Sequence, residues 1–305
     1  MSKNKVFLTG AAGYVGGSIA AKFLESGYQV TGLVRSQDKV KDLEEQGIIP
    51  FMGTLEDYQP LKDAVQDADI IINAADADNV YPVTAILEAI EGSGKTFIHN
   101  SGSDVVGDKA AGEYREQIFY EDAFMPPHEK KAGVFVDQLV MGAANRGIHS
   151  IVICPGLIYG EGRGIKKDSI QIPEMIQLAL KKGLAHHIGK GENVWSTVHI
   201  DALAELYMLA VEHAPAGSFY FAGNKEVSFK EIAETINTTF NLGSETKSMT
   251  VDEGIQEWGA TGAHLVFGSN SRIRSLKAQK ILGWKPKGPS VLQDIQSGYY
   301  KDHFS

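Results

Sequence analysis

The chain has 305 residues, of which 43% are hydrophobic and 22% are charged, and these fractions exclude a disordered or fibrous protein. The formal net charge of −9 argues against a nucleic-acid or anionic-membrane partner. One cysteine, Cys154, excludes an internal disulfide and a cysteine-rich metal site, and we expect no metal. Without a signal-like or membrane-spanning apolar run, we expect a cytoplasmic protein.

Short apolar runs alternate with helical patterns through the first half of the chain. The runs are continuous, which is typical of strands buried on both faces of a parallel sheet. They cover residues 6–8, 30–34, 48–52, 70–72, 96–98 and 151–154. Between the first two, Val15, Ile19 and Phe23 have helical spacing, and Gly27 follows as a helix stop. This alternation predicts an α/β fold with a Rossmann-type, doubly wound parallel sheet.

The second half is less regular and predicts a smaller C-terminal α/β lobe. Residues 172–182 predict a helix, and residues 218–222 predict a strand. Ser228 and Glu231 have the spacing of a capping box, which opens a helix that we expect to end near Gly243. We therefore predict a dinucleotide-binding domain of residues 1–158 with 195–222. Residues 159–194 with 223–305 form the substrate-side lobe.

A glycine-rich loop follows the first predicted strand directly and opens the first predicted helix. Gly10 permits a tight turn, Gly13 permits close approach of a pyrophosphate, and Gly16 permits close packing of helix on strand. The helix N-terminus supplies free N–H groups to the phosphates. The loop therefore predicts a dinucleotide site. Its expected contacts are Thr9, Gly10, Ala12, Gly13, Tyr14, Val15 and Gly16.

The end of the second strand distinguishes the two nicotinamide cofactors. An NAD-preferring site has an acidic residue there for the ribose hydroxyls, whereas this chain has Arg35. A guanidinium suits a 2′-phosphate in charge and in geometry, and Ser36 and Lys39 are positioned to add contacts. We therefore predict that NADP(H) is preferred over NAD(H).

Several motifs occur in one order along nearly the whole chain. Residues 9–16 read TGAAGYVG, residues 154–160 read CPGLIYG, residues 198–204 read VHIDALA, and residues 282–286 read LGWKP. In this order they resemble the extended and atypical short-chain dehydrogenases/reductases, the NAD(P)-dependent epimerase/dehydratase-like proteins. The resemblance implies further cofactor contacts. These are Thr54, Leu55, Ala74, Ala75, Asn100, Pro155 and Leu157.

The catalytic residues of the resembling family are not found at their expected places. That family uses a Tyr, a Lys four residues later, and a Ser or Thr after the fifth strand. Matching residues 137–140 to the family's helix places Glu129 at the Tyr position and Gly133 at the Lys position. Lys130 or Lys131 is then the candidate for the ribose contact.

Candidates for the missing catalytic hydroxyl and for the missing proton donor lie nearby in the sequence. Ser101 and Ser103 flank the position of the family's catalytic hydroxyl, which falls at Gly102. Tyr120 and His128 precede the expected catalytic helix, and a His of near-neutral pKa suits proton transfer. Tyr114 and Tyr159 are further candidates.

Two functions remain open on the sequence. The first is an NADP(H)-dependent oxidoreductase or epimerase that acts on a small carbonyl or hydroxyl substrate with non-standard catalytic groups. The second is a non-catalytic NADP(H)-binding redox sensor or regulatory protein, which the missing Tyr–Lys pair suggests. The resemblance also allows a homodimer, because the helices before the fifth and sixth strands are common dimer surfaces in that family.

Overall fold

The computed structural model describes residues 5–122 and 131–305, without the side chains of residues 131 and 132. The strands are β1 (Lys5–Thr9), β2 (Gln29–Val34), β3 (Ile49–Met52), β4 (Ile70–Asn73), β5 (Thr96–Asn100), β6 (Phe119–Tyr120), β7 (His149–Pro155), β8 (Leu157–Tyr159), β9 (His186–Ile188), β10 (Val194–His199), β11 (Ser218–Ala222), β12 (Lys225–Ser228), β13 (Lys247–Met249) and β14 (Ile273–Arg274). The α-helices are α1 (Tyr14–Glu25), α2 (Asp38–Glu45), α3 (Tyr58–Ala64), α4 (Val80–Ala89), α5 (Lys131–Gly142), α6 (Gln171–Lys182), α7 (Ile200–His213), α8 (Phe229–Thr239), α9 (Val251–Thr261), α10 (Leu276–Leu282), α11 (Val291–Ser297) and α12 (Tyr299–Phe304). The shorter turns of helix are η1 (Ser103–Val106), η3 (Ala143–Arg146) and η4 (Gly262–Phe267).

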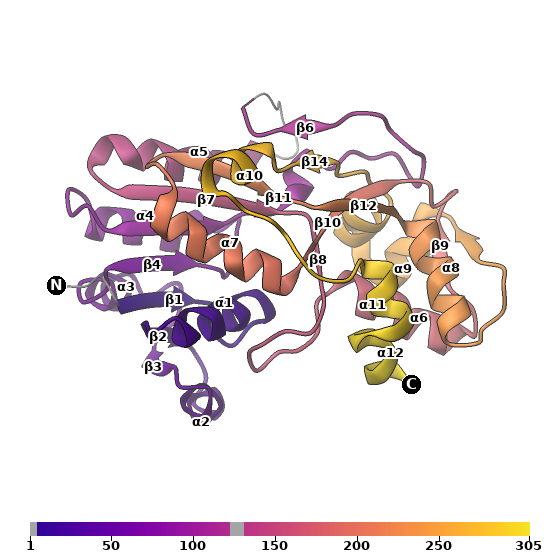
Figure 1. Ribbon diagram of the computed structural model, residues 1–305, viewed down its shortest axis with the longest axis horizontal. Helices are drawn as coiled ribbons and strands as arrows, with labels where there is room; N and C mark the ends of the chain where they lie inside the picture. Colours follow the sequence, from indigo (N-terminus) through magenta and orange to yellow (C-terminus); the bar gives the residue numbers. More distant parts are fainter. Residues whose placement is uncertain (1–4, 123–130) are drawn as a thin grey trace.

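A seven-stranded sheet forms the larger part of the molecule (Figure 1). Its order is β11-β7-β5-β4-β1-β2-β3, and every neighbouring pair is parallel. The chain winds outward in both directions from β1, so the topological switch point lies between β1 and β4. Ligands of such sheets bind at the carboxyl ends of the strands beside this point. The predicted doubly wound fold is confirmed.

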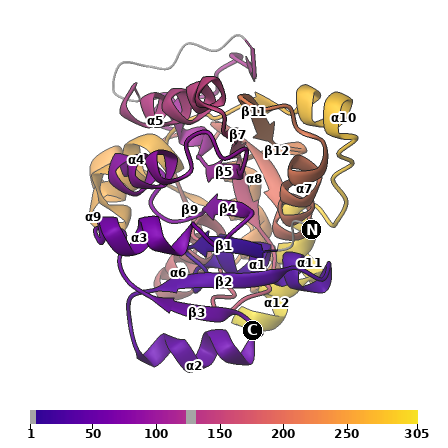
Figure 2. The same ribbon diagram turned by 90° about the vertical axis from the view of Figure 1, so that its left-hand side faces the viewer.

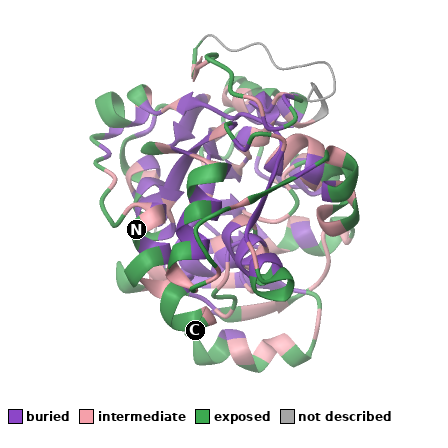
Figure 3. Cartoon of the chain, turned by 90° about the vertical axis from the view of Figure 1, so that its right-hand side faces the viewer, coloured by how far each residue is buried: buried purple, intermediate pink, exposed green. Residues whose placement is uncertain are grey.

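Helices cover both faces of this sheet, with α3, α4 and α5 on one face and α1 and α7 on the other (Figure 2). Alternate residues of β1 supply the two cores: Val6 and Leu8 belong to the core under α1 and α7, and Phe7 belongs to the core under α4 and α5. All three are buried. Figure 3 shows the buried class along strands in the interior of the molecule. Burial on both faces explains why the strands read as continuous apolar runs in the sequence.

The C-terminal part has a third core of its own, centred on residues such as Ile176, Trp195 and Phe229. The predicted helix after residue 170 is α6, and it ends at Gly183 with φ +73°. The predicted capping box is formed, with Ser228 and Glu231 bonded reciprocally at the start of α8. Residues 195–199 differ from expectation, because they belong to β10 in a three-stranded sheet with β8 and β12.

Two negative findings apply to residues 5–122 and 131–305. No helix there is long and apolar enough to cross a membrane. No group of three or more His, Cys, Asp or Glu side chains in the same ranges is arranged to hold a metal ion. His186 and His187 lie on β9, where each hydrogen-bonds to a local group.

Candidate functional site

The glycine loop makes a tight turn between β1 and α1. Gly10 has φ +76°, and its carbonyl accepts a hydrogen bond of 2.8 Å from the Gly13 N–H. A Cβ at Gly10 would lie 2.7 Å from the Ala74 carbonyl oxygen, and a Cβ at Gly16 would lie 2.2 Å from the Gly10 carbonyl oxygen. Side chains at these two positions would therefore displace the loop from the strand ends.

The start of α1 suits an anionic group. The helix has twelve residues, its N-cap Gly13 offers no capping side chain, and its first turn has no acidic residue. Its first N–H groups and the positive end of its dipole therefore face the cavities that Gly13 lines. The residues present fit the pyrophosphate of a dinucleotide.

A cavity of about 800 Å³ extends from the glycine loop toward α2. Arg35 and Ser36 line it at the end of β2, and Thr54 and Leu55 line it after β3. Arg35 is exposed and has no acidic partner within the described ranges. Lys39 also lines the cavity and pairs with Asp42 at 3.1 Å. The end of the cavity near α2 therefore has the guanidinium of Arg35, which is unpaired within the described ranges, and the ammonium group of Lys39.

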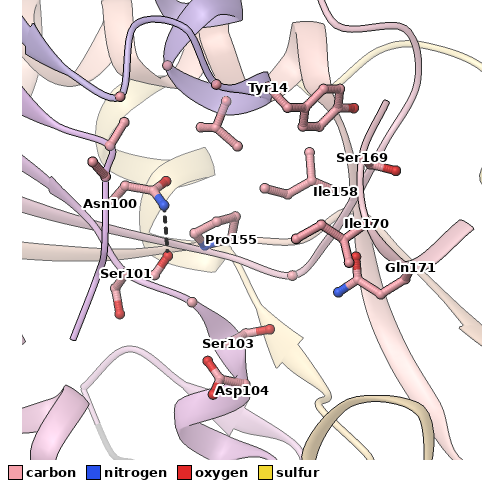
Figure 4. A pocket seen from close by; sticks show the side chains of 18 of the residues that line it. Tyr14, Asn100, Ser101, Ser103, Asp104, Pro155, Ile158, Ser169, Ile170 and Gln171 are labelled. Atoms are coloured by element: carbon pink, nitrogen blue, oxygen red, sulfur yellow. Dashed lines mark hydrogen bonds between the residues drawn. The ribbon is translucent and has the colours of Figure 1, made fainter. Parts of the chain in front are cut away.

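A second cavity, of about 550 Å³, extends from the same loop toward the C-terminal lobe. It shares Gly10, Gly13 and Ala75 with the first cavity, so both cavities border the glycine loop. Asn100 ends β5, and Ser101, Ser103 and Asp104 follow it along one side of the cavity. Ile158, Ile170 and Gln171 face them (Figure 4). Trp195 and Val266 complete an apolar far side. Sequence reasoning missed this far side, because these residues are distant along the chain and carry no motif.

Most of the predicted cofactor residues lie on one or both cavities. Those on the wall are Gly10, Ala12, Gly13, Tyr14, Val15, Gly16, Arg35, Ser36, Lys39, Thr54, Leu55, Ala74, Ala75, Asn100 and Pro155. Thr9 and Leu157 are not on the wall, since both are fully buried. Lys131 begins α5, but its side chain lies outside the description.

The structure places only some of the predicted catalytic residues on the wall of the second cavity. Ser101 and Ser103 are buried on the cavity wall. The Ser101 hydroxyl donates to Asp137 Oδ2 at 2.9 Å, and the Ser103 hydroxyl lies 2.9 Å from that of Ser271. Tyr120 lies on β6, 44% exposed and away from this wall, and His128 lies outside the described residues.

The other two tyrosine candidates have structural partners. The Tyr114 hydroxyl bonds to Arg272 at 2.7 Å, and the Tyr159 hydroxyl donates to the Pro289 carbonyl at 2.8 Å. Neither lines the second cavity. Gly133, at the position of the family's Lys, lies on α5, where a Cβ would come within 2.7 Å of Asp78 Oδ1.

Two buried titratable residues beside the cavity were not singled out from the sequence. Asp137 on α5 and His99 on β5 are 1% and 0% exposed, and His99 Nε2 lies 3.9 Å from Asp137 Oδ1. Burial raises the pKa of Asp137 to about 7 and lowers the pKa of His99 to about 4. Cys154 is also buried in this core, where burial raises the pKa of its thiol, as suits a packing residue.

The comparisons with known proteins agree with this geometry. Residues 6–223 match the model of the NAD dependent epimerase/dehydratase family. An uncharacterized protein of Schizosaccharomyces pombe is 30% identical and covers 97% of this chain and 99% of its own. A 4-hydroxy-2-methyl-3-oxo-4-farnesyl-3,4-dihydroquinoline-1-oxide ketoreductase of Stigmatella aurantiaca is 26% identical over 71% of this chain and 67% of its own.

Solved structures show the same fold. The dTDP-glucose 4,6-dehydratase of Bacillus anthracis, in complex with NAD, superposes with a TM-score of 0.77 at 20% identity, over 98% of this chain and 97% of that one. The chain therefore belongs to the NAD dependent epimerase/dehydratase family, and it is an enzyme of the oxidoreductase and epimerase type that uses a nicotinamide cofactor. The resemblance stated from the sequence is confirmed.

Proposed function

We propose that this protein is an NADP(H)-dependent oxidoreductase that interconverts a small carbonyl compound and its alcohol. The observation that carries the proposal is the second cavity, which the glycine loop, Pro155, Ser101 and Ser103 line together. The bound cofactor supplies or takes the hydride. The chain orients the substrate, excludes water and handles the proton at the substrate oxygen.

The proposed preference for NADP(H) rests on Arg35. Arg35 lines the cavity at the end of β2, where a 2′-phosphate would lie, and it forms no ion pair within the described part of the chain, although Asp38, Glu56 and Asp76 line the same cavity. Lys39 shares its charge with Asp42, so we expect it to contribute less.

The proposed substrate is a compact, largely apolar carbonyl compound. Ile158, Ile170, Trp195 and Val266 make the far side apolar, and Lys166 is the one cation among the described lining residues. A nucleotide diphosphate would require more positive charge than this wall offers. The ketoreductase relative, whose name describes a 3-oxo group on a dihydroquinoline oxide that carries a farnesyl chain, supports an apolar carbonyl substrate.

The test is a turnover assay with aryl ketones, o-quinones and 3-oxo esters, with NADPH and NADH compared at matched concentrations. We expect NADPH oxidation with at least one ketone and tighter binding of NADPH than of NADH. Arg35→Ser should remove most of that difference and leave NADH binding unchanged. The absence of turnover with the whole panel would refute the oxidoreductase, and equal dissociation constants for the two cofactors would refute the preference.

We also propose that the protein acts as a cytoplasmic homodimer through α4 and α5. Tyr81 on α4 is 74% exposed and Phe135 on α5 is 58% exposed, on two helices that pack together. Large exposed apolar side chains on adjacent helices are typical of a protein interface. No observation within the described residues favours the non-catalytic alternative.

A further inference from the structure

Buried polar side chains lie beneath the second cavity from β1 to α5, in two hydrogen-bonded groups that meet at a His99–Asp137 contact of 3.9 Å. The Thr9 hydroxyl donates to Asn73 Oδ1 at 2.5 Å, and Asn73 Nδ2 lies 3.1 Å from His99 Nδ1. His99 Nε2 then faces Asp137 Oδ1 at 3.9 Å, and Asp137 Oδ2 accepts from Ser101 at 2.9 Å. Of these five residues, only Ser101 lines the cavity.

The hydrogen bonds among Thr9, Asn73 and His99 have a consistent assignment of donors and acceptors. Thr9 occupies the amide oxygen of Asn73, so the Asn73 NH₂ faces His99 and must donate to Nδ1. The neutral imidazole then carries its proton on Nε2, directed toward Asp137. Thr9 and Asn73 therefore set the tautomer of His99, whose Nε2 lies 3.9 Å from Asp137 Oδ1, beyond hydrogen-bond distance.

Asp137 is placed to exchange a proton with Ser101. When Asp137 is a carboxylate, Ser101 donates to it. When Asp137 is protonated, it donates to Ser101, whose own proton is then free for another acceptor. Gly102 follows directly and places no side chain between this hydroxyl and a substrate oxygen.

We propose that Asp137 is the proton reservoir of the active site and exchanges its proton with the substrate oxygen through the Ser101 hydroxyl. This inference rests on the proposed oxidoreductase function. In reduction, the carbonyl carbon receives a hydride from the dihydronicotinamide while the carbonyl oxygen takes the Ser101 proton. Ser101 then takes the proton of Asp137, which water restores after the product leaves. The carbonyl is reduced, the cofactor is oxidised, and one proton is consumed.

The charges around Asp137 suit this role. Burial raises its pKa to about 7, the Ser101 hydrogen bond lowers it, and Asp78 and Asp104 raise it further. His99 stays neutral above about pH 4, and the Cys154 thiol stays protonated because its burial raises its pKa. Of Asp137, His99 and Cys154, Asp137 is therefore the group that changes charge near neutral pH. A proton donor of near-neutral pKa is the most effective at that pH.

The test is the pH profile of single-turnover hydride transfer, measured by stopped flow with the NADPH-loaded protein and its fastest panel ketone. In the wild type, the reduction rate should fall as pH rises through about 7, because only protonated Asp137 donates. In Asp137→Asn this limb should disappear, with a rate roughly 10²-fold lower below neutral pH. NADPH affinity should be unchanged. Ser101→Ala should lower the rate similarly and is a second variant if Asp137→Asn folds poorly.

The matched control is Asp294→Asn, which changes another buried carboxyl of raised pKa, on α11 and away from this cavity. It should retain the wild-type pH profile. A wild-type profile in Asp137→Asn or in Ser101→Ala would overturn the relay and leave the oxidoreductase intact. NADPH binding without turnover of any panel ketone by the wild type would refute the oxidoreductase and the relay together.

Discussion

The glycines of the first loop show how single atoms govern the cofactor site. Gly16 lies in the first turn of α1, and a Cβ there would be 2.2 Å from the Gly10 carbonyl oxygen. Because that obstacle is backbone, a side chain at this position displaces the loop. The glycine is therefore required by packing as well as by the approach of the phosphates.

We expect Gly16→Ala to weaken NADPH binding by at least about tenfold and to lower the free energy of unfolding by about 1–3 kcal/mol, a range typical of overpacking. Calorimetric titration and urea denaturation measure the two effects. Gly142→Ala is the control, because a Cβ at that helical position meets no atom within 4 Å. Wild-type affinity in Gly16→Ala would show that the loop adapts without cost.

At the scale of elements, α8 shows how a local signal fixes a helix boundary. The Ser228 hydroxyl accepts from the Glu231 N–H at 3.2 Å, and the Glu231 carboxylate accepts from the Ser228 N–H at 2.8 Å. Ile232 and Ile236 follow on the buried face of the helix and join the core of the C-terminal lobe. The cap therefore fixes where this buried face begins.

We expect Ser228→Ala to lower the free energy of unfolding by about 1 kcal/mol, because the first turn of α8 loses a capping acceptor. Urea denaturation followed by circular dichroism measures the change. Ser244→Ala, in the exposed loop after the helix, should have no effect. An equal loss in both variants would show that the capping box contributes nothing specific.

Elements with local signals were predictable from sequence, and the substrate side of the site was not. The buried strands, the glycine loop and the α8 cap each depend on residues close together in the chain. In contrast, Asp137 reads as an ordinary polar position of a helix. It becomes a buried acid only because β5 brings Ser101 and His99 against it. Trp195 and Val266 likewise meet the glycine loop only through the tertiary fold.

At the scale of the whole molecule, the two buried titratable residues have opposite effects on stability as pH changes. The pKa of Asp137 is raised from 3.8 to about 7, so its stabilising contribution is complete below about pH 4 and is lost as pH rises to about 7. The pKa of His99 is lowered from 6.5 to about 4, so its contribution is present above about pH 6.5 and is lost as pH falls to about 4. Between these limits the two effects oppose each other.

We therefore expect Asp137→Asn to gain stability relative to the wild type as pH rises from about 4 to about 7, at up to about 1.4 kcal/mol per pH unit. The removed group is the one whose ionisation opposes folding in this range. Urea denaturation at several pH values across the range measures the difference. A constant difference between variant and wild type would contradict the raised pKa of Asp137.

The proposed dimer is a second property of the whole molecule. We expect Phe135→Arg to convert a dimer to a monomer at micromolar concentration, because a buried, unpaired guanidinium opposes association. Light scattering after size exclusion measures the mass. Leu276→Arg, at another exposed apolar residue on α10, should leave the mass unchanged. A monomeric wild type would refute the proposal.

The buried polar side chains of Thr9, Asn73, His99, Asp137 and Ser101 also constrain which substitutions this sequence tolerates. It joins β1, β4, β5 and α5 through side chains that are each nearly inaccessible to water. Replacement of one member by an apolar residue leaves its neighbour buried without a partner, which costs about 1–3 kcal/mol, whereas concerted replacement of both can be nearly neutral. Positions 73 and 99 are far apart in the sequence. We therefore expect them to be substituted together, and not singly, in descendants of this chain.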